Sequence, residues 1–183
     1  MKKSTIKLLG VFLIVSVLCV CEIRNVFIST KSELVELIKN VAMSQSKIQL
    51  SIQSRSDYIP RLIEEAEKNI SSQTEILKDL ESINTQIANC IDLGRFMEAE
   101  KYNNKLTLKL ENLYYMYPVL MENEKFCELR KKIEECEKDI NSAIGEYNTS
   151  AKEFNMKLDQ IPANIVAKML GYNQMKYFKA DES

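Results

Sequence analysis

Residues 117–171, YPVLMENEKFCELRKKIEECEKDINSAIGEYNTSAKEFNMKLDQIPANIVAKMLG, carry the most extended apolar pattern of the chain. Apolar side chains recur there at steps of three and four residues, which is the spacing of one face of an α-helix. The stripe consists of Phe126, Leu129, Ile133, Cys136, Ile140, Ala143, Ile144, Tyr147, Ala151, Phe154 and Leu158. One helix cannot bury such a stripe alone, so the rest of the chain must supply helices that pack against it.

Helix-breaking residues set the expected limits of this helix and its neighbours. Tyr117-Pro118 predicts the end of a helix over about 95–116 and a restart at about residue 120. The restarted helix is expected to run to Leu158. Pro162 suits the first turn of a short helix, and Gly171 suits its carboxyl cap. Asp92-Leu93-Gly94 predicts the break before the helix over 95–116.

Two further helices are expected upstream, over about 29–55 and 58–91. Pro60 favours a break between them, because proline lacks an amide hydrogen and disfavours helical geometry in the residue before it. Asp57 then suits a helix cap. The alternatives are a continuous, kinked helix through Pro60, and a charged contact surface formed by Asp57 beside Arg55. Gln73 and Asn84 are polar positions in the expected seam and are interpreted as markers of its register.

The predicted fold class is all-α: an antiparallel four-helix up-and-down bundle of long helices behind an N-terminal membrane segment, with a short C-terminal helix. Only 4 Gly and 3 Pro occur in 183 residues, so turns should be few and elements long. The apolar seams have coiled-coil-like spacing. The expected division is a membrane anchor over 1–28, the bundle over 29–171 and a tail over 172–183.

Residues 8–21 form a continuous apolar run that follows Lys2, Lys3 and Lys7. The run favours an uncleaved signal anchor that crosses the membrane once, and a cleaved signal peptide is the alternative. A buried core helix is the third interpretation, which the flanking lysines oppose. The side of the membrane stays open, because the amino-terminal lysines favour an exported bundle whereas three unpaired cysteines in the bundle favour the cytoplasm.

Composition argues against several function classes. Residues 1–30 carry a net charge of +3, and since the whole chain carries −1, the remainder carries −4 and offers no basic surface for nucleic acid. The chain contains no His, which removes the commonest general base and metal ligand. Its 5 Cys lack zinc-ligand spacing and a disulfide framework. We therefore expect no catalytic residues, no metal and no cofactor.

Several segments resemble the signatures of the LemA family of bacterial proteins. Residues 55–64 are similar to its RRxDLIPNLVE signature, and residues 117–129 match YPxLxxNENFxxL. Residues 137–155 match ExxIxxxRxxYNxxVxxYN, and residues 162–172 match PSNxxAxxxGF. Tyr177-Phe178 matches the terminal aromatic pair. The resemblance implies a four-helix bundle on a single N-terminal membrane segment, and it implies no biochemical activity.

The candidate site residues are Tyr147, Asn148, Phe154 and Asn155, together with Arg55 and Asp57. The Tyr-Asn and Phe-Asn pairs are seven residues apart and share one helix face, which predicts an amide-lined groove for a partner helix. The alternative is a pair of core aromatics whose asparagines cap carbonyls near Pro60. Two weaker clusters also occur. Glu134, Glu135 and Glu137 favour a solvated helix face over a carboxylate cluster for a divalent metal or general acid, and Lys168, Lys176 and Lys179 suit contacts with anionic lipid headgroups.

The function predicted from these observations is a membrane-anchored, non-catalytic scaffold or adaptor that binds an unknown protein partner. The alternative is an exported helical domain that binds a small ligand or acts as an enzyme in a pocket between helices.

Overall fold

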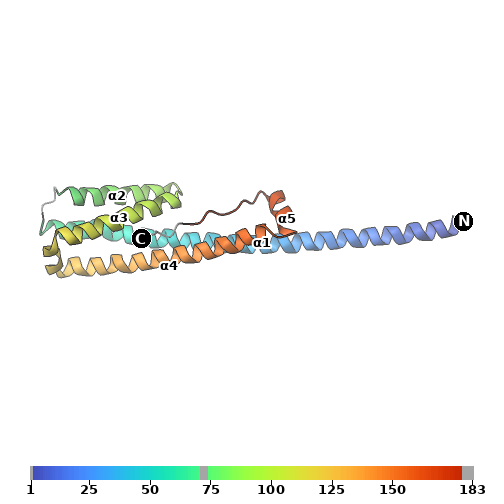
Figure 1. Cartoon of the computed structure of the whole chain (residues 1–183), viewed down its shortest axis with the longest axis horizontal. Helices are drawn as coiled ribbons and strands as arrows, with labels where there is room; N and C mark the ends of the chain where they lie inside the picture. Colours follow the sequence, from blue (N-terminus) through green and yellow to red (C-terminus); the bar gives the residue numbers. More distant parts are fainter. Residues whose placement is uncertain (1, 71–73, 179–183) are drawn as a thin grey trace. The chain divides into compact units, whose positions relative to one another are not determined.

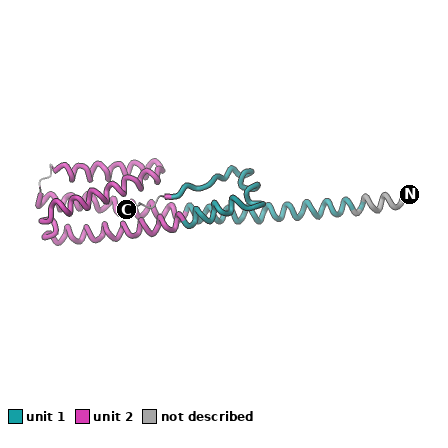
Figure 2. Tube along the Cα trace, in the orientation of Figure 1, with its two compact units in different colours: residues 1–42, 149–177 teal, residues 43–148, 178–183 magenta. Residues whose placement is uncertain are grey.

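The protein is described by a computed structural model that covers residues 2–70 and 74–178, in which all regular structure is helical. The helices are α1 (Lys2–Glu67), α2 (Glu75–Asp92), α3 (Phe96–Met116), the 3-10 helix η1 (Pro118–Glu122), α4 (Glu124–Leu158) and α5 (Ala163–Leu170) (Figure 1). The chain divides into two compact units (Figure 2). Unit 1 is residues 1–42 and 149–177, and unit 2 is residues 43–148 and 178–183.

Unit 2 contains the four-helix arrangement that the sequence predicts. It combines the second half of α1 with α2, α3 and the first part of α4. Ion pairs connect Lys47 to Glu146 and Arg55 to Glu137, so the partner number on α4 falls as the number on α1 rises. These two helices are therefore antiparallel. Its core is aliphatic and includes Ile48, Ile52, Ile59, Leu62, Leu77, Leu80, Ile87, Leu106, Leu110, Leu113, Ile133 and Ile140.

Unit 1 is smaller and contains the first part of α1, the end of α4, α5 and the segment that follows α5. An ion pair between Glu33 and Lys157 joins α1 to α4. Leu34, Phe154 and Leu158 are buried in this unit. Unit 1 also holds the long exposed apolar part of α1, from Phe12 to Ile28. The domain division predicted at residues 28 and 171 stays a prediction.

The expected break at Pro60 is wrong, and the alternative of a continuous helix is confirmed. Helix α1 runs through Pro60 to Glu67, and Asp57 lies within the helix, where it accepts a hydrogen bond from Gln53 Nε2 at 2.9 Å. Proline at this position leaves the carbonyl of Ser56 without its usual i+4 amide donor. Asn84 of α2 fills this role, because its Nδ2 donates to the Ser56 carbonyl at 3.2 Å.

Asn84 and Ser56 form a second hydrogen bond, in which Ser56 Oγ donates to Asn84 Oδ1 at 2.7 Å. The asparagine in the seam is thus explained by the proline on the facing helix. The helix predicted over 58–91 is accordingly wrong in its limits: α1 ends at Glu67 and α2 begins at Glu75. Asn69, a residue type that favours turns over helix interiors, follows the end of α1. Gln73 lies outside the described residues.

The predicted start of a helix at about residue 29 is also wrong, because α1 runs from Lys2 through this position without a break. The limits of the later helices agree closely with the prediction. Helix α3 ends at Met116 before Tyr117-Pro118, and α4 ends at Leu158. Helix α4 begins at Glu124 rather than residue 120, since η1 intervenes and Asn123 Oδ1 accepts the amide hydrogen of Phe126 at 3.1 Å, as a helix cap does. Gly171 caps α5 with φ 74°, and the amide of Tyr172 donates to the carbonyl of Ala167.

Candidate functional site

Two of the six predicted site residues, Arg55 and Asp57, are not brought together. Arg55 is buried at 1% exposure, whereas Asp57, two positions further along α1, is exposed. A helix turns by about 200° over two residues, so both cannot face the same surface. The structure therefore does not form the charged contact surface that was the alternative for this pair.

Arg55 instead lies at the centre of a polar network that joins three helices of unit 2. Its Nη1 contacts Glu137 Oε2 of α4 at 2.6 Å and donates to Asn103 Oδ1 of α3 at 2.7 Å. Its Nη2 donates to Thr107 Oγ1 at 2.9 Å. Burial lowers the pKa of the Arg55 guanidinium, and the negative charge of Glu137 opposes that shift. The arginine therefore connects α1 to α3 and α4 through buried polar contacts.

Sequence reasoning missed this network, because it placed Glu137 on a solvated face with Glu134 and Glu135. Glu134 and Glu135 are exposed, and Glu134 pairs with Arg130. Glu137 differs because its side chain is 23% exposed and faces Arg55. The sequence does indicate that Arg55 is buried, because it falls at helical spacing between the apolar residues Ile52 and Ile59.

A cleft of about 370 Å³ borders the network. It is lined in part by Arg55, Tyr114, Arg130, Glu134 and Glu137. Burial raises the pKa of Tyr114 to about 12, and the Arg130 guanidinium lies 4.6 Å from the centre of its ring. Among the described residues, neither Tyr114 Oη nor Arg55 Nε has a hydrogen-bond partner. Arg55 and Tyr114, which line the cleft, thus each carry a buried polar atom without a hydrogen-bond partner.

Asn148 and Asn155 each hold a piece of the segment that follows α5. In unit 1, Asn155 Oδ1 accepts the amide hydrogen of Met175 at 2.7 Å, and its Nδ2 donates to the Met175 carbonyl at 2.9 Å. In unit 2, Asn148 makes the same pair of bonds with the amide and carbonyl of Phe178, at 2.9 and 3.0 Å. Each asparagine side chain thus bonds both the backbone amide and the backbone carbonyl of one residue.

The aromatic partners of these asparagines contact the same segment. Tyr147 meets Phe178 edge to face at 4.9 Å between ring centres. Phe154 is buried and meets Tyr172 at 6.0 Å. The repeat therefore accepts an extended part of its own chain, where the sequence predicted a groove for a partner helix. Binding of a separate partner at these residues stays a prediction.

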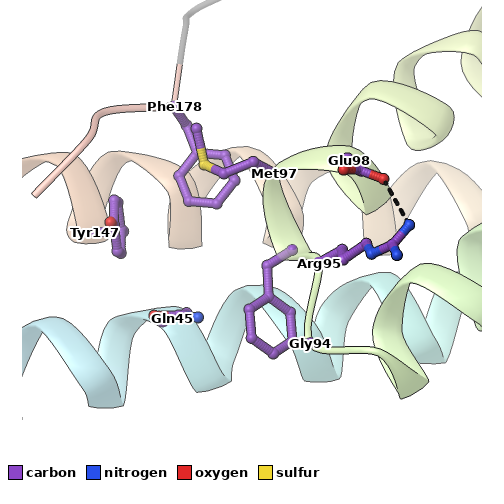
Figure 3. Close-up of a pocket in the computed structure, with 8 residues that line it drawn as sticks. Gln45, Gly94, Arg95, Met97, Glu98, Tyr147 and Phe178 are labelled. Atoms are coloured by element: carbon purple, nitrogen blue, oxygen red, sulfur yellow. Dashed lines mark ion pairs between the residues drawn. The ribbon is translucent and has the colours of Figure 1, made fainter.

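Tyr147 and Phe178 also line a pocket of about 240 Å³ in unit 2. Figure 3 shows Gln45 of α1 below, Tyr147 of α4 at the left, and Phe178 beside Met97 of α3. The dashed line in that view marks the ion pair of Arg95 and Glu98, both exposed. The pocket shows no pair of convergent polar groups comparable to Arg55 and Tyr114 among the residues that line it.

Comparison with models of protein families assigns the chain to a family. The model of the LemA family matches residues 44–183. The chain belongs to the LemA family. The match includes both asparagine pairs, Arg55 and the segment over 172–178 of this LemA-family protein. A search of curated proteins found no match.

The N-terminal part of α1 lies outside the family match and has a distinct character. From Phe12 onward α1 is long and apolar enough to cross a membrane, and its most apolar 18-residue window has a mean hydropathy of 2.0. None of that window is buried against the rest of the protein. Phe12, Val20 and Ile23 are 75%, 64% and 69% exposed. Within the part of the chain that the structure describes, these side chains stay exposed.

Proposed function

We propose that this LemA-family protein is a single-pass, membrane-anchored and non-catalytic scaffold that holds a helical bundle at the membrane for a protein partner. The observation that carries the proposal is the continuity of α1, whose exposed apolar part over 12–28 leads without interruption into the packed part. A helix with large apolar side chains exposed around it is stable in lipid and unstable in water, and the polar residues Glu22, Arg24 and Asn25 lie toward the end of this stretch.

A surface for the partner is proposed on unit 2, around the end of α3. Tyr115 is 86% exposed, and Leu108, Met116 and Val119 are 61%, 58% and 44% exposed. Leu108 and Tyr115 are seven residues apart, which places them on one face of α3. Clusters of exposed apolar side chains on a soluble surface mark protein-binding sites more often than single ones do.

Charge substitutions test the anchor. Leu13→Lys with Val17→Lys should release the protein from the membrane fraction, since each lysine near the centre of a membrane helix costs about 3 kcal/mol. Leu50→Lys with Leu108→Lys is the matched control, because both leucines are exposed apolar residues in unit 2, at 68% and 61%. Retention of the first variant at the level of the control would contradict the anchor.

Photo-crosslinking in living cells tests the scaffold. A photoreactive amino acid at Tyr115 should form one discrete adduct with another protein, and the same residue at Lys152, an exposed position of unit 1, should not. Equal, diffuse adducts from both positions would contradict a specific surface at the end of α3.

A second candidate function is binding of a small polar molecule in the cleft beside Arg55. The unpartnered Tyr114 Oη and Arg55 Nε favour it, since both are donors that a carbonyl or hydroxyl oxygen would satisfy. The cleft also has the volume of a small-ligand site. A thermal-shift screen of small polar metabolites should find a stabiliser that Tyr114→Phe no longer recognises, and a screen without such a compound would contradict this candidate.

A further inference from the structure

Helix α5 is apolar on both of its faces, but the protein buries only one of them. Ala163, Val166 and Ala167 are buried in unit 1, at exposures of 0–3%. On the other side, Ile165 and Met169 are 57% and 69% exposed. A soluble helix of this length normally turns polar side chains to water, so the second apolar face points to another apolar medium.

Ile161, which lies two residues before the helix begins, is a further exposed apolar side chain, at 80% exposure. Lys168 is exposed beside Met169, and the sequence of α5 contains no acidic residue. The exposed face is thus three large apolar side chains with one positive charge, a combination that suits the surface of a membrane with anionic lipids.

The position of α5 within unit 1 also favours contact with a membrane surface. Pro162, at its start, lines a common pocket with Asn25, Val26, Ser29 and Thr30 of α1. These residues lie where the exposed apolar run of α1 ends at Ile28. Figure 1 shows α5 beside α1 at this place, and Figure 2 shows both in the same unit. The start of α5 therefore lies next to the end of the exposed apolar run of α1.

We propose that α5 is an interfacial helix: Ile161, Ile165 and Met169 insert into the headgroup region of the leaflet from which α1 emerges, and Lys168 contacts an anionic lipid headgroup. The inference rests on the proposed membrane anchor. It gives the anchor a second point of contact, which would fix unit 1 against the membrane surface rather than leave it tethered by α1 alone.

A second copy of the chain fits this face less well. Stable interfaces between proteins bury about 800 Å² on each partner, and three side chains on an eight-residue helix supply only part of that. A bilayer needs no matched surface and is already placed at the adjoining part of α1 by the anchor. Continuity with that membrane contact therefore favours lipid.

The test places an environment-sensitive NBD fluorophore on single cysteines in a variant that lacks the native cysteines. The full chain is reconstituted in nanodiscs of phosphatidylcholine and phosphatidylglycerol, with or without brominated acyl chains. Ile165→Cys and Met169→Cys are the probe positions. Val17→Cys reports the anchor, and Leu50→Cys, which is 68% exposed and 22 residues beyond Ile28 on α1, is the matched control.

Brominated lipid should reduce emission about twofold at both α5 positions, since an interfacial helix sits within reach of the upper acyl chains, and leave the control unchanged. Circular dichroism identical to the unlabelled protein verifies folding of each variant. Emission at Val17 that is not quenched would refute the anchor itself. Quenching at Val17 without quenching at either α5 position would overturn the interfacial helix alone, as would a disulfide-linked dimer through Ile165→Cys.

Lys168 is tested in the same nanodiscs. Quenching at Ile165→Cys should be stronger with phosphatidylglycerol than with phosphatidylcholine alone, and Lys168→Gln should remove that difference. Equal quenching in both lipids would overturn the headgroup contact of Lys168.

Discussion

The two halves of α1 place their side chains in opposite ways. From Phe12 to Ile28 the apolar side chains lie outside, whereas further along the same helix Arg55 and Ser56 are buried at 1% and 5% exposure. The hydrophobicity of a side chain alone does not predict whether it is buried in either half. The contrast teaches that burial depends on what surrounds each segment: lipid in the proposal for the first half, and matched hydrogen-bonding partners in the second.

The largest expected effect comes from removing the partner of the buried charge. Glu137→Ala should lower the free energy of unfolding by about 3 kcal/mol, because it leaves the Arg55 guanidinium buried without its counter-charge. Arg55→Met should cost less, because Glu137 is partly exposed and can turn to water. Guanidinium unfolding in mild detergent, followed by circular dichroism, measures both. A larger loss for Arg55→Met would contradict this account of the second half of α1.

The next largest effect is a loss of stability at alkaline pH, caused by ionisation of Tyr114. The phenol has a raised pKa of about 12 in the folded protein, against an ordinary value of 10.0. Below pH 10 it is neutral in both states and has no effect. Between those values only the unfolded chain loses the proton, so stability falls with rising pH, by at most about 3 kcal/mol. Tyr114→Phe should lack this part of the loss, and identical pH profiles for both proteins would contradict the burial of the phenol.

A smaller effect tests how α1 passes through Pro60. Asn84→Leu removes the donor to the Ser56 carbonyl and should destabilise the protein. In a Pro60→Ala background the alanine amide can donate to that carbonyl, so the same substitution should cost about 1 kcal/mol less. Additive losses in this double-mutant cycle would show that Asn84 does not compensate for the proline.

The smallest effect on global stability is expected at the end of the chain. Asn155→Leu removes both hydrogen bonds to Met175 and should speed hydrogen exchange of the Met175 amide with little change in the unfolding midpoint. Asn155→Asp keeps an acceptor for that amide and should preserve more of the protection. Exchange as slow in Asn155→Leu as in the parent protein would contradict the role of the asparagine.

Local sequence patterns predicted much of this fold. The apolar stripe from Phe126 to Leu158 gave α4, and Pro118 and Gly171 marked helix ends correctly, because their effects are local to the backbone. Pro60 was misjudged for the opposite reason. Its missing hydrogen bond is replaced by Asn84, 24 positions away in the sequence and on another helix, which no local rule can see.

The candidate site was predicted less completely. The spacing of Tyr147-Asn148 and Phe154-Asn155 predicted an amide-lined groove for a partner helix, whereas the two asparagines bind the chain's own segment over 172–178. Arg55 was placed on a surface because its charge usually favours water, whereas its partners Asn103, Thr107 and Glu137 lie at least 48 positions away. Long-range partners therefore decided the positions of Pro60 and Arg55, at which the sequence misled.

A cysteine scan along α1 tests the central contrast most directly. Single cysteines at Leu13, Val17, Glu36 and Leu50, in a variant without native cysteines, are treated with a hydrophilic maleimide in membranes opened on both sides. The account predicts protection at Leu13 and Val17 and reaction at Glu36 and Leu50, although the described structure leaves all four side chains exposed. Labelling of Val17 as fast as Leu50 would place the first half of α1 in water and contradict the account.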